Sequence, residues 1–219
     1  MIDGSKRRGN VVGFFTSQKM KTSIHYHSLA ECIYFYMLEL DHKVSEYYVQ
    51  PVNIPVVVGN KHGNRSWPYV PDVLVFYRDG SVKLAEIKYD RDEMNDPQQL
   101  LRQRAAKVYA TLHGWEYEVI CPNDFHPMLK QNLRFLMQFI KPREGLEAVK
   151  NEIINNAATE GQKIYKLLEV LAKKLLSKKP NLLPHIYHLV ASGFLLVDMF
   201  KPIDLKSHVR LVTSKSEAS

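Results

Sequence analysis

The sequence predicts an α/β domain in the first half of the chain and a mainly helical domain in the second half. Up to residue 125, runs with apolar residues at helical spacing alternate with runs rich in Val, Ile and Tyr. From residue 126 onward, four segments have helical spacing, and β-like runs return only near the end of the chain. We therefore expect two domains, at residues 1–125 and 126–219.

The α/β half is predicted to run helix, three strands, helix, strand. The first helix spans residues 29–40, where apolar side chains recur at helical spacing. The second helix is expected to begin at Asp96 and to run to about His113, because Asp96 can cap it and Pro97 suits the first helical turn. Strands are expected at 44–58 (broken by two prolines), 70–77, 82–89 and 115–121, with a turn or exposed loop at 59–65.

The helical half has an element order typical of a winged helix-turn-helix. Gly193 can end the fourth helix, and Phe194–Phe200 and Ser207–Val212 then form a hairpin. Helices followed by a hairpin are the order of a winged helix, and the alternative is a helical bundle with an extended tail. The four helices are expected at 128–140, 146–155, 163–176 and 182–192.

The excess of positive over negative charge lies entirely in the second half of the chain. The formal net charge is +7, yet Lys plus Arg and Asp plus Glu both number 15 up to Phe125, against 15 and 8 from His126 onward. A basic half suits a polyanionic partner such as DNA, although a solvated basic surface is also common.

The cysteine content and the apolar runs bear on where the protein is located. Two cysteines, Cys32 and Cys121, form neither a disulfide framework nor a metal cluster, and no apolar run is long enough to cross a membrane. We therefore expect a cytoplasmic protein.

Three residues on two of the predicted strands form the sharpest functional signal. Glu86 and Lys88 alternate on one strand, so both side chains point to one face. Asp72 lies on the preceding strand, and a two-residue loop would turn it to the wrong face. A three-residue loop, with Gly80 in the left-handed position, instead places Asp72 opposite Glu86, with Cβ atoms about 5 Å apart.

This constellation has the form Pro-Asp followed by Glu-x-Lys, the PD-(D/E)xK pattern of metal-dependent nucleases. Two adjacent carboxylates repel each other unless a cation or a proton lies between them, and Mg²⁺ or Mn²⁺ prefers such oxygen ligands. The ion can polarise a phosphate and activate a water, and Lys88 can stabilise the charge that develops. The alternative is an ordinary surface strand that carries Glu86 and Lys88, beside an Asp72 at the sheet edge.

Glu31 is a third acidic candidate with two interpretations. Ser28 and Glu31 have the spacing of a capping box, in which Glu31 bonds back to the start of the first helix. The same position, on the first helical turn, also allows Glu31 to reach the metal site.

Five short motifs follow one another along the first half of the chain: Thr16-Ser17-Gln18-Lys19, Ser28-Leu29-Ala30-Glu31, Val49-Gln50-Pro51, Tyr69-Val70-Pro71-Asp72 and Glu86-Ile87-Lys88. In this order they resemble the motifs of TnsA endonucleases, the nuclease partner of heteromeric TnsA/TnsB-type transposases. The resemblance spans most of residues 10–125.

The resemblance implies a restriction-endonuclease-like PD-(D/E)xK core that cuts one DNA strand at each transposon 5′ end with Mg²⁺ or Mn²⁺. It implies a TnsB-type transposase and a TnsC-type ATPase as partners, and a bacterial, nucleoid-associated location. It also implies that Glu31, Asp72 and Lys88 are catalytic, with Glu31, Asp72 and Glu86 as metal ligands. Family members often have Gln at the position of Glu86, so Glu86 is either a full ligand or a tolerated substitute.

Two other functions remain open from the sequence. One is another nuclease with the same core, such as a junction resolvase or a repair nickase, although the long basic second half argues against a minimal resolvase. The other is a non-catalytic DNA-binding adaptor, against which the intact Asp72, Glu86 and Lys88 argue.

Overall fold

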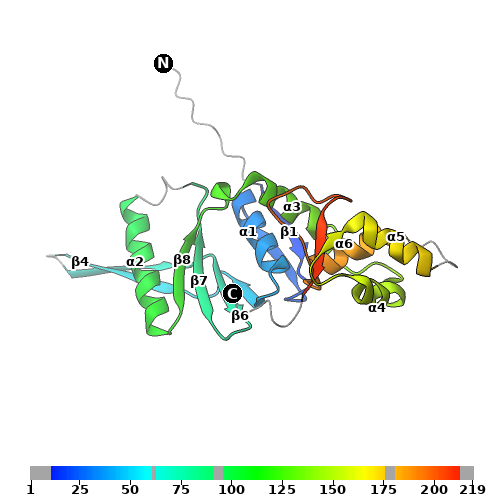
Figure 1. Cartoon of the computed structure of the whole chain (residues 1–219). Helices are drawn as coiled ribbons and strands as arrows, with labels where there is room; N and C mark the ends of the chain where they lie inside the picture. Colours follow the sequence, from blue (N-terminus) through cyan, green and yellow to red (C-terminus); the bar gives the residue numbers. More distant parts are fainter. Residues whose placement is uncertain (1–10, 61–62, 91–95, 176–180, 213–219) are drawn as a thin grey trace, which may run out of the picture. The chain divides into compact units, whose positions relative to one another are not determined.

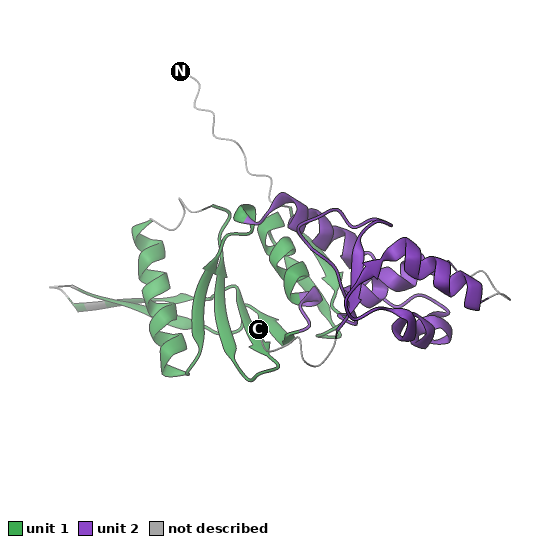
Figure 2. Cartoon of the chain, in the orientation of Figure 1, with its two compact units in different colours: residues 1–38, 43–124 green, residues 39–42, 125–219 purple. Residues whose placement is uncertain are grey.

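The computed structural model describes residues 11–60, 63–90, 96–175 and 181–212, and its elements are labelled in Figure 1. The chain divides into two compact units, one of residues 1–38 and 43–124 and one of residues 39–42 and 125–219 (Figure 2). Leu40, at the end of the first helix, packs against the core of the second unit, which is why this short segment belongs there. No helix within the described ranges is long and apolar enough to span a membrane.

The first unit is a mixed α/β unit built on a four-stranded sheet of order β3-β6-β7-β8. The first three strands are antiparallel, and β7 and β8 are parallel because helix α2 connects them. The strands are β3 (Val44–Val49), β6 (Val73–Tyr77), β7 (Val82–Ile87) and β8 (Glu116–Ile120). The helices are α1 (Leu29–Leu40) and α2 (Pro97–Leu112), followed after β8 by a single 3₁₀ turn, η2 (Pro122–Asp124).

Both predicted helices of this unit are confirmed. Helix α1 has the predicted bounds, and α2 begins directly after Asp96, whose side chain accepts a hydrogen bond from the Gln99 N–H at 2.9 Å. Asp96 therefore caps the helix as its sequence indicates, and Pro97 occupies the first turn.

Helices or strands cover both faces of the sheet, as its apolar residues on both sides indicate. On one face, Phe35 of α1 stacks on Tyr47 of β3 with ring centroids 6.2 Å apart. On the other face, Leu74 and Leu84 pack with residues of α2 and of a second hairpin. Glu86 alternates with Leu84 on β7 and so points to this second face.

The turn between β6 and β7 has the predicted register. Gly80 has a φ of 87°, and the Tyr77 N–H donates to the Ser81 carbonyl at 2.9 Å. Val73 is paired with Ala85, which places Asp72, one residue earlier, opposite Glu86. The three-residue loop inferred from Arg78-Asp79-Gly80 is therefore confirmed.

Because this turn sets the register of the carboxylates, Gly80→Ala is expected to destabilise the unit. An alanine at a φ of 87° costs about 1 kcal/mol, although a Cβ there would meet no other atom within 4 Å. The melting temperature should fall by roughly 2–4 °C. Gly80→Asn should lose less, since asparagine tolerates the left-handed region. Equal losses for both variants would show that backbone conformation is not the cause.

A hairpin of β4 (Ile54–Asn60) and β5 (Gly63–Tyr69) differs from the sequence prediction. Residues 59–65 were expected to form a turn or loop, and residues 61–62 at its tip lie outside the described residues. Strand β5 has few apolar residues and contains Pro68, so its composition does not indicate a strand. It forms through pairing with β4, where Pro68 lies opposite Pro55, and a two-stranded ribbon tolerates proline because each strand is an edge. A further hairpin of β1 (Gly13–Thr16) and β2 (Ser23–Tyr26) precedes α1.

The second unit is helical, with a small antiparallel sheet of order β10-β11-β9. All four predicted helices are present, most with ends shifted by one to three residues, and Gly193, with a φ of 78°, follows the last of them. The elements are α3 (Pro127–Met137), α4 (Leu146–Asn156), β9 (Gln162–Lys163), α5 (Ile164–Lys174), α6 (Leu183–Ala191), β10 (Leu195–Leu196) and β11 (His208–Leu211).

The strand predicted at Phe194–Phe200 is only two residues long. Asp198 ends it, because its side chain accepts from the Phe200 N–H at 2.9 Å and its carbonyl accepts from the Lys201 N–H. Helix α6 lies in the apolar core of this unit, and its residues 185–191 are all buried. Its side chains therefore serve packing.

Candidate active site

The predicted site residues Asp72, Glu86 and Lys88 lie at the ends of strands β6 and β7. Asp72 immediately precedes β6, Glu86 lies at the end of β7, and Lys88 follows that strand. The Ile87 N–H donates to Asp72 Oδ2 at 2.6 Å, which ties the carboxylate of one strand to the backbone of the other. The structure thus brings these three residues together, through the register that the turn imposes.

Glu86 is the most enclosed member of the site, with only 3% of its surface exposed. Its Oε1 accepts from Lys88 Nζ at 2.5 Å and from Gln99 Nε2 at 3.2 Å. Its Oε2 accepts a hydrogen bond from the Tyr69 hydroxyl. A buried carboxylate requires partners of this kind, because burial without hydrogen bonds or an opposite charge costs several kcal/mol.

The electrostatics of Asp72 favour a bound cation. Burial raises the pKa of Asp72 to about 7, and the neighbouring charge of Glu86 adds to this. The Ile87 N–H and the Lys88 ammonium group oppose the rise, and Glu31 contributes weakly to it. A divalent ion between the Asp72 and Glu86 carboxylates would offset their repulsion, which a bound proton relieves when no ion is present.

The residues present suit a hard ion with few protein ligands. Within the part of the chain that the structure describes, no group of three or more His, Cys, Asp or Glu residues is arranged to hold a metal ion. Asp72 and Glu86 are therefore the two carboxylates that could hold an ion here. Mg²⁺ is commonly bound in this way, since it keeps several waters and takes its other ligands from substrate phosphates.

The structure places Glu31 in its capping box. The Glu31 N–H donates to Ser28 Oγ at 3.0 Å, and Glu31 Oε2 accepts from the His27 N–H at 2.9 Å. The Ser28 hydroxyl also donates to Glu31 Oε1 at 3.0 Å. Both carboxylate oxygens thus have protein partners, although the charge is near enough to Asp72 to affect its pKa. The catalytic role of Glu31 stays a prediction.

The substitution Glu31→Gln separates the two interpretations of Glu31. Gln can still accept the bond from the His27 N–H, so the melting temperature should change by only a few degrees, as expected for about 1 kcal/mol of capping energy. A neutral side chain is a weak metal ligand, so we expect cleavage to fall by roughly 10²-fold, about 2.7 kcal/mol in activation free energy. Cleavage at the normal rate would leave Glu31 with the capping role alone.

Two residues of the site, Tyr69 and Gln99, were not predicted. Tyr69 opens the motif that contains Asp72, but the strand that carries it was not foreseen. Gln99 shares the buried face of α2 with Ala106 and Ala110, and a glutamine in an apolar stripe is the signal that could have indicated it. Gln98 and Lys107, on the same helix, are exposed.

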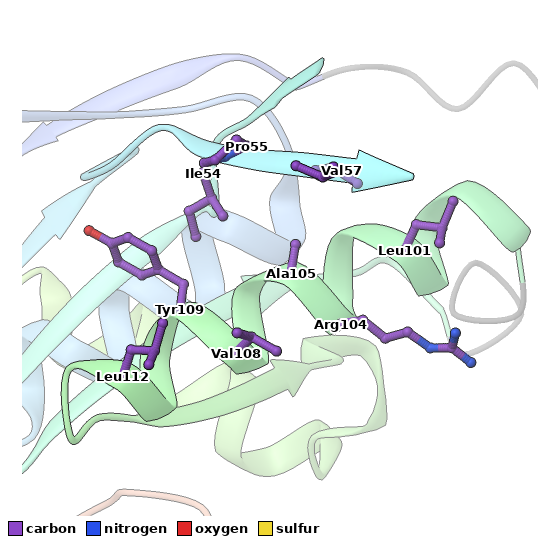
Figure 3. A pocket seen from close by; sticks show the side chains of 10 residues that line it. Ile54, Pro55, Val57, Leu101, Arg104, Ala105, Val108, Tyr109 and Leu112 are labelled. Carbon is purple, nitrogen blue, oxygen red and sulfur yellow. The ribbon is translucent and has the colours of Figure 1, made fainter. Parts of the chain in front are cut away.

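An apolar groove in the same unit is separate from this site. It has a volume of about 470 Å³ and lies between β4 and α2 (Figure 3). Its lining residues are Ile54, Pro55, Val56, Val57, Leu101, Arg104, Ala105, Val108, Tyr109 and Leu112. Asp72, Glu86 and Lys88 are not among them, so the groove does not enclose the carboxylates.

Comparison with known proteins identifies the domain that carries this site. Residues 41–121 match the family of TnsA-like endonuclease N-terminal domains. No curated protein matches the chain. The matched segment runs from just before β3 to just after β8 and contains Asp72, Glu86 and Lys88, whereas Glu31 precedes it. The chain therefore contains a TnsA-like endonuclease N-terminal domain at residues 41–121.

Proposed function

We propose that this protein is a Mg²⁺- or Mn²⁺-dependent DNA endonuclease that cuts one strand at the 5′ ends of a transposon. The proposal depends on the position of Asp72, which immediately precedes β6 and lies opposite Glu86 of β7, with Lys88 bonded to Glu86, inside a TnsA-like domain. A TnsB-type transposase would cut the 3′ ends, and a TnsC-type ATPase would regulate both.

Each residue of the site has a distinct part in this reaction. Asp72 and Glu86 would hold the ion, and the Asp72 carboxyl, whose pKa is raised to about 7 by burial and by the charge of Glu86, would give up its proton to do so. A metal ion held there would supply Lewis acidity for attack of a water on the phosphate. Lys88 holds Glu86 and stabilises the negative charge that develops on the phosphoryl oxygens.

The second unit is proposed to bind DNA or a protein partner as a winged-helix-like domain. Its order of α4, β9, α5, α6, β10 and β11, with β11 between β10 and β9, supports this. Because residues 185–191 of α6 are buried, exposed cations elsewhere in the unit would have to make such contacts. Lys166 and Lys173 on α5 and Arg210 on β11 are exposed cations of this kind.

The proposed function is tested by mapping the cut strand. Duplex DNA that carries a candidate transposon end, with each strand labelled separately, is incubated with the protein, Mg²⁺ and the TnsB- and TnsC-type partners. The expected result is a cut at the 5′ end of the transposon that requires this protein, while the TnsB-type transposase cuts the 3′ end on the other strand.

The same assay with other DNA substrates, and with or without the partners, tests the rival functions. Cutting of four-way junctions without the partners would indicate a junction resolvase. Cutting only at damaged sites would indicate a repair nickase. DNA binding with no cut at the 5′ end in either Mg²⁺ or Mn²⁺, with both partners present, would indicate a non-catalytic adaptor.

A further inference from the structure

Glu86 is held by donors from outside the strand that carries it. Tyr69 lies at the end of β5, and Gln99 lies in the first turn of α2. Tyr69 and Gln99 are 7% and 5% exposed, so their polar groups lie in the interior of the unit. Neither belongs to the Pro-Asp or Glu-x-Lys motif, and both direct a donor at Glu86.

The two donors bind different oxygens of the carboxylate. Tyr69 occupies Oε2, and Gln99 shares Oε1 with Lys88. Bonds to both oxygens, from different elements, fix the rotation of the carboxylate about its terminal torsion, which is otherwise broad.

Each donor is itself held in place by its element. Gln99 is fixed at the start of α2, where its backbone N–H bonds to the cap, Asp96. Tyr69 is paired with Ile54 across the β4–β5 hairpin and packs in the apolar cluster with Leu74 and Leu84. The hairpin and the helix thus form a rigid support behind the strand that carries Glu86.

We propose that Tyr69 and Gln99 are positioning residues that orient Glu86 toward Asp72 for metal binding. This inference rests on the proposed nuclease function. Hydrogen-bond partners of metal ligands commonly contribute 10–100-fold to metal affinity, because they pre-orient the ligand. Loss of either donor should therefore weaken metal binding without altering the fold, since a phenyl ring keeps nearly all of the packing of Tyr69.

The test compares Tyr69→Phe and Gln99→Met with the control Tyr109→Phe. Tyr109 is on α2 and lines the apolar groove (Figure 3), and Tyr109→Phe removes the same hydroxyl from a residue that is not among the described donors to Glu86. Mn²⁺ affinity is measured without DNA, by calorimetry and by the metal-induced rise in melting temperature. We expect both variants to bind Mn²⁺ roughly tenfold more weakly than wild type, and the control to bind normally.

A double substitution shows whether Tyr69 acts through Glu86. Glu86→Ala should itself weaken Mn²⁺ binding, and adding Tyr69→Phe should then cause no further loss, since coupled residues are not additive. A further tenfold loss in that background would contradict the inference. Normal Mn²⁺ binding by Tyr69→Phe, or an equal loss in Tyr109→Phe, would also overturn it.

Failure of the inference can be told apart from failure of the proposed function. If wild type binds no Mn²⁺ and makes no cut, both fail together. If wild type and all three variants bind Mn²⁺ and cut normally, only the inference fails.

Discussion

The substitution Asp72→Asn is expected to abolish DNA cleavage and to raise the melting temperature of the metal-free protein at pH 8. Cleavage depends on the charge, because a neutral amide is a poor ligand for a hard divalent ion. Loss of several kcal/mol of transition-state stabilisation corresponds to a rate lower by roughly 10³-fold or more. Asn can still accept the bond from the Ile87 N–H, so the link between the strands is kept.

The rise in stability follows from the direction of the pKa shift. The pKa of Asp72 is about 7 in the folded protein, well above its ordinary value of 3.8, because the carboxyl is buried beside Glu86. Between these pH values the folded state binds more protons than the unfolded state, so stability falls as pH rises from about 4 to about 7. Asn removes that dependence, and melting curves at pH 5.5 and pH 8 measure it.

The matched control for this prediction is Asp79→Asn. Asp79 is exposed on the same hairpin and accepts bonds from Ser81, which asparagine can keep, so the charge change is the same but lies away from the site. We expect normal cleavage by this control. Normal cleavage by Asp72→Asn as well would remove the assignment of the active site.

Removal of divalent metal is the second change with a large expected effect. Cleavage should stop in chelator, return with Mg²⁺ or Mn²⁺, and remain absent in Ca²⁺. Ca²⁺ accepts oxygen ligands at longer distances and in looser geometry, so it should bind without arranging the attacking water. The expected loss is again roughly 10³-fold or more, because the Lewis acid and the activated water are lost together.

The metal requirement should depend on pH through Asp72. The ion competes with the proton on this carboxyl, whose pKa of about 7 results from burial and from Glu86. The Mg²⁺ concentration for half-maximal cleavage should therefore rise as pH falls below about 7, by roughly tenfold for each pH unit. Cleavage at the full rate in chelator, or Mg²⁺ requirements that are equal at pH 6 and pH 8, would contradict a metal bound by Asp72.

The sequence by itself determined the local elements of the site. The bounds of α1, the cap of α2 and the register of β6 and β7 each depend on residues close together in the chain, such as Asp96-Pro97 and the turn at Arg78-Asp79-Gly80. Short-range patterns predict such features because turn geometry and capping involve only a few consecutive residues. The position of Asp72 opposite Glu86 follows from the register of β6 and β7 that the turn sets.

Only the tertiary structure decided how Glu86 is held and how Asp72 titrates. Tyr69 reaches Glu86 from a strand that exists through its pairing with β4, and Gln99 reaches it because α2 packs over the same sheet face. The pKa of Asp72 is set by burial, to which elements distant in sequence contribute. Such effects depend on long-range packing, which no local pattern of residues encodes.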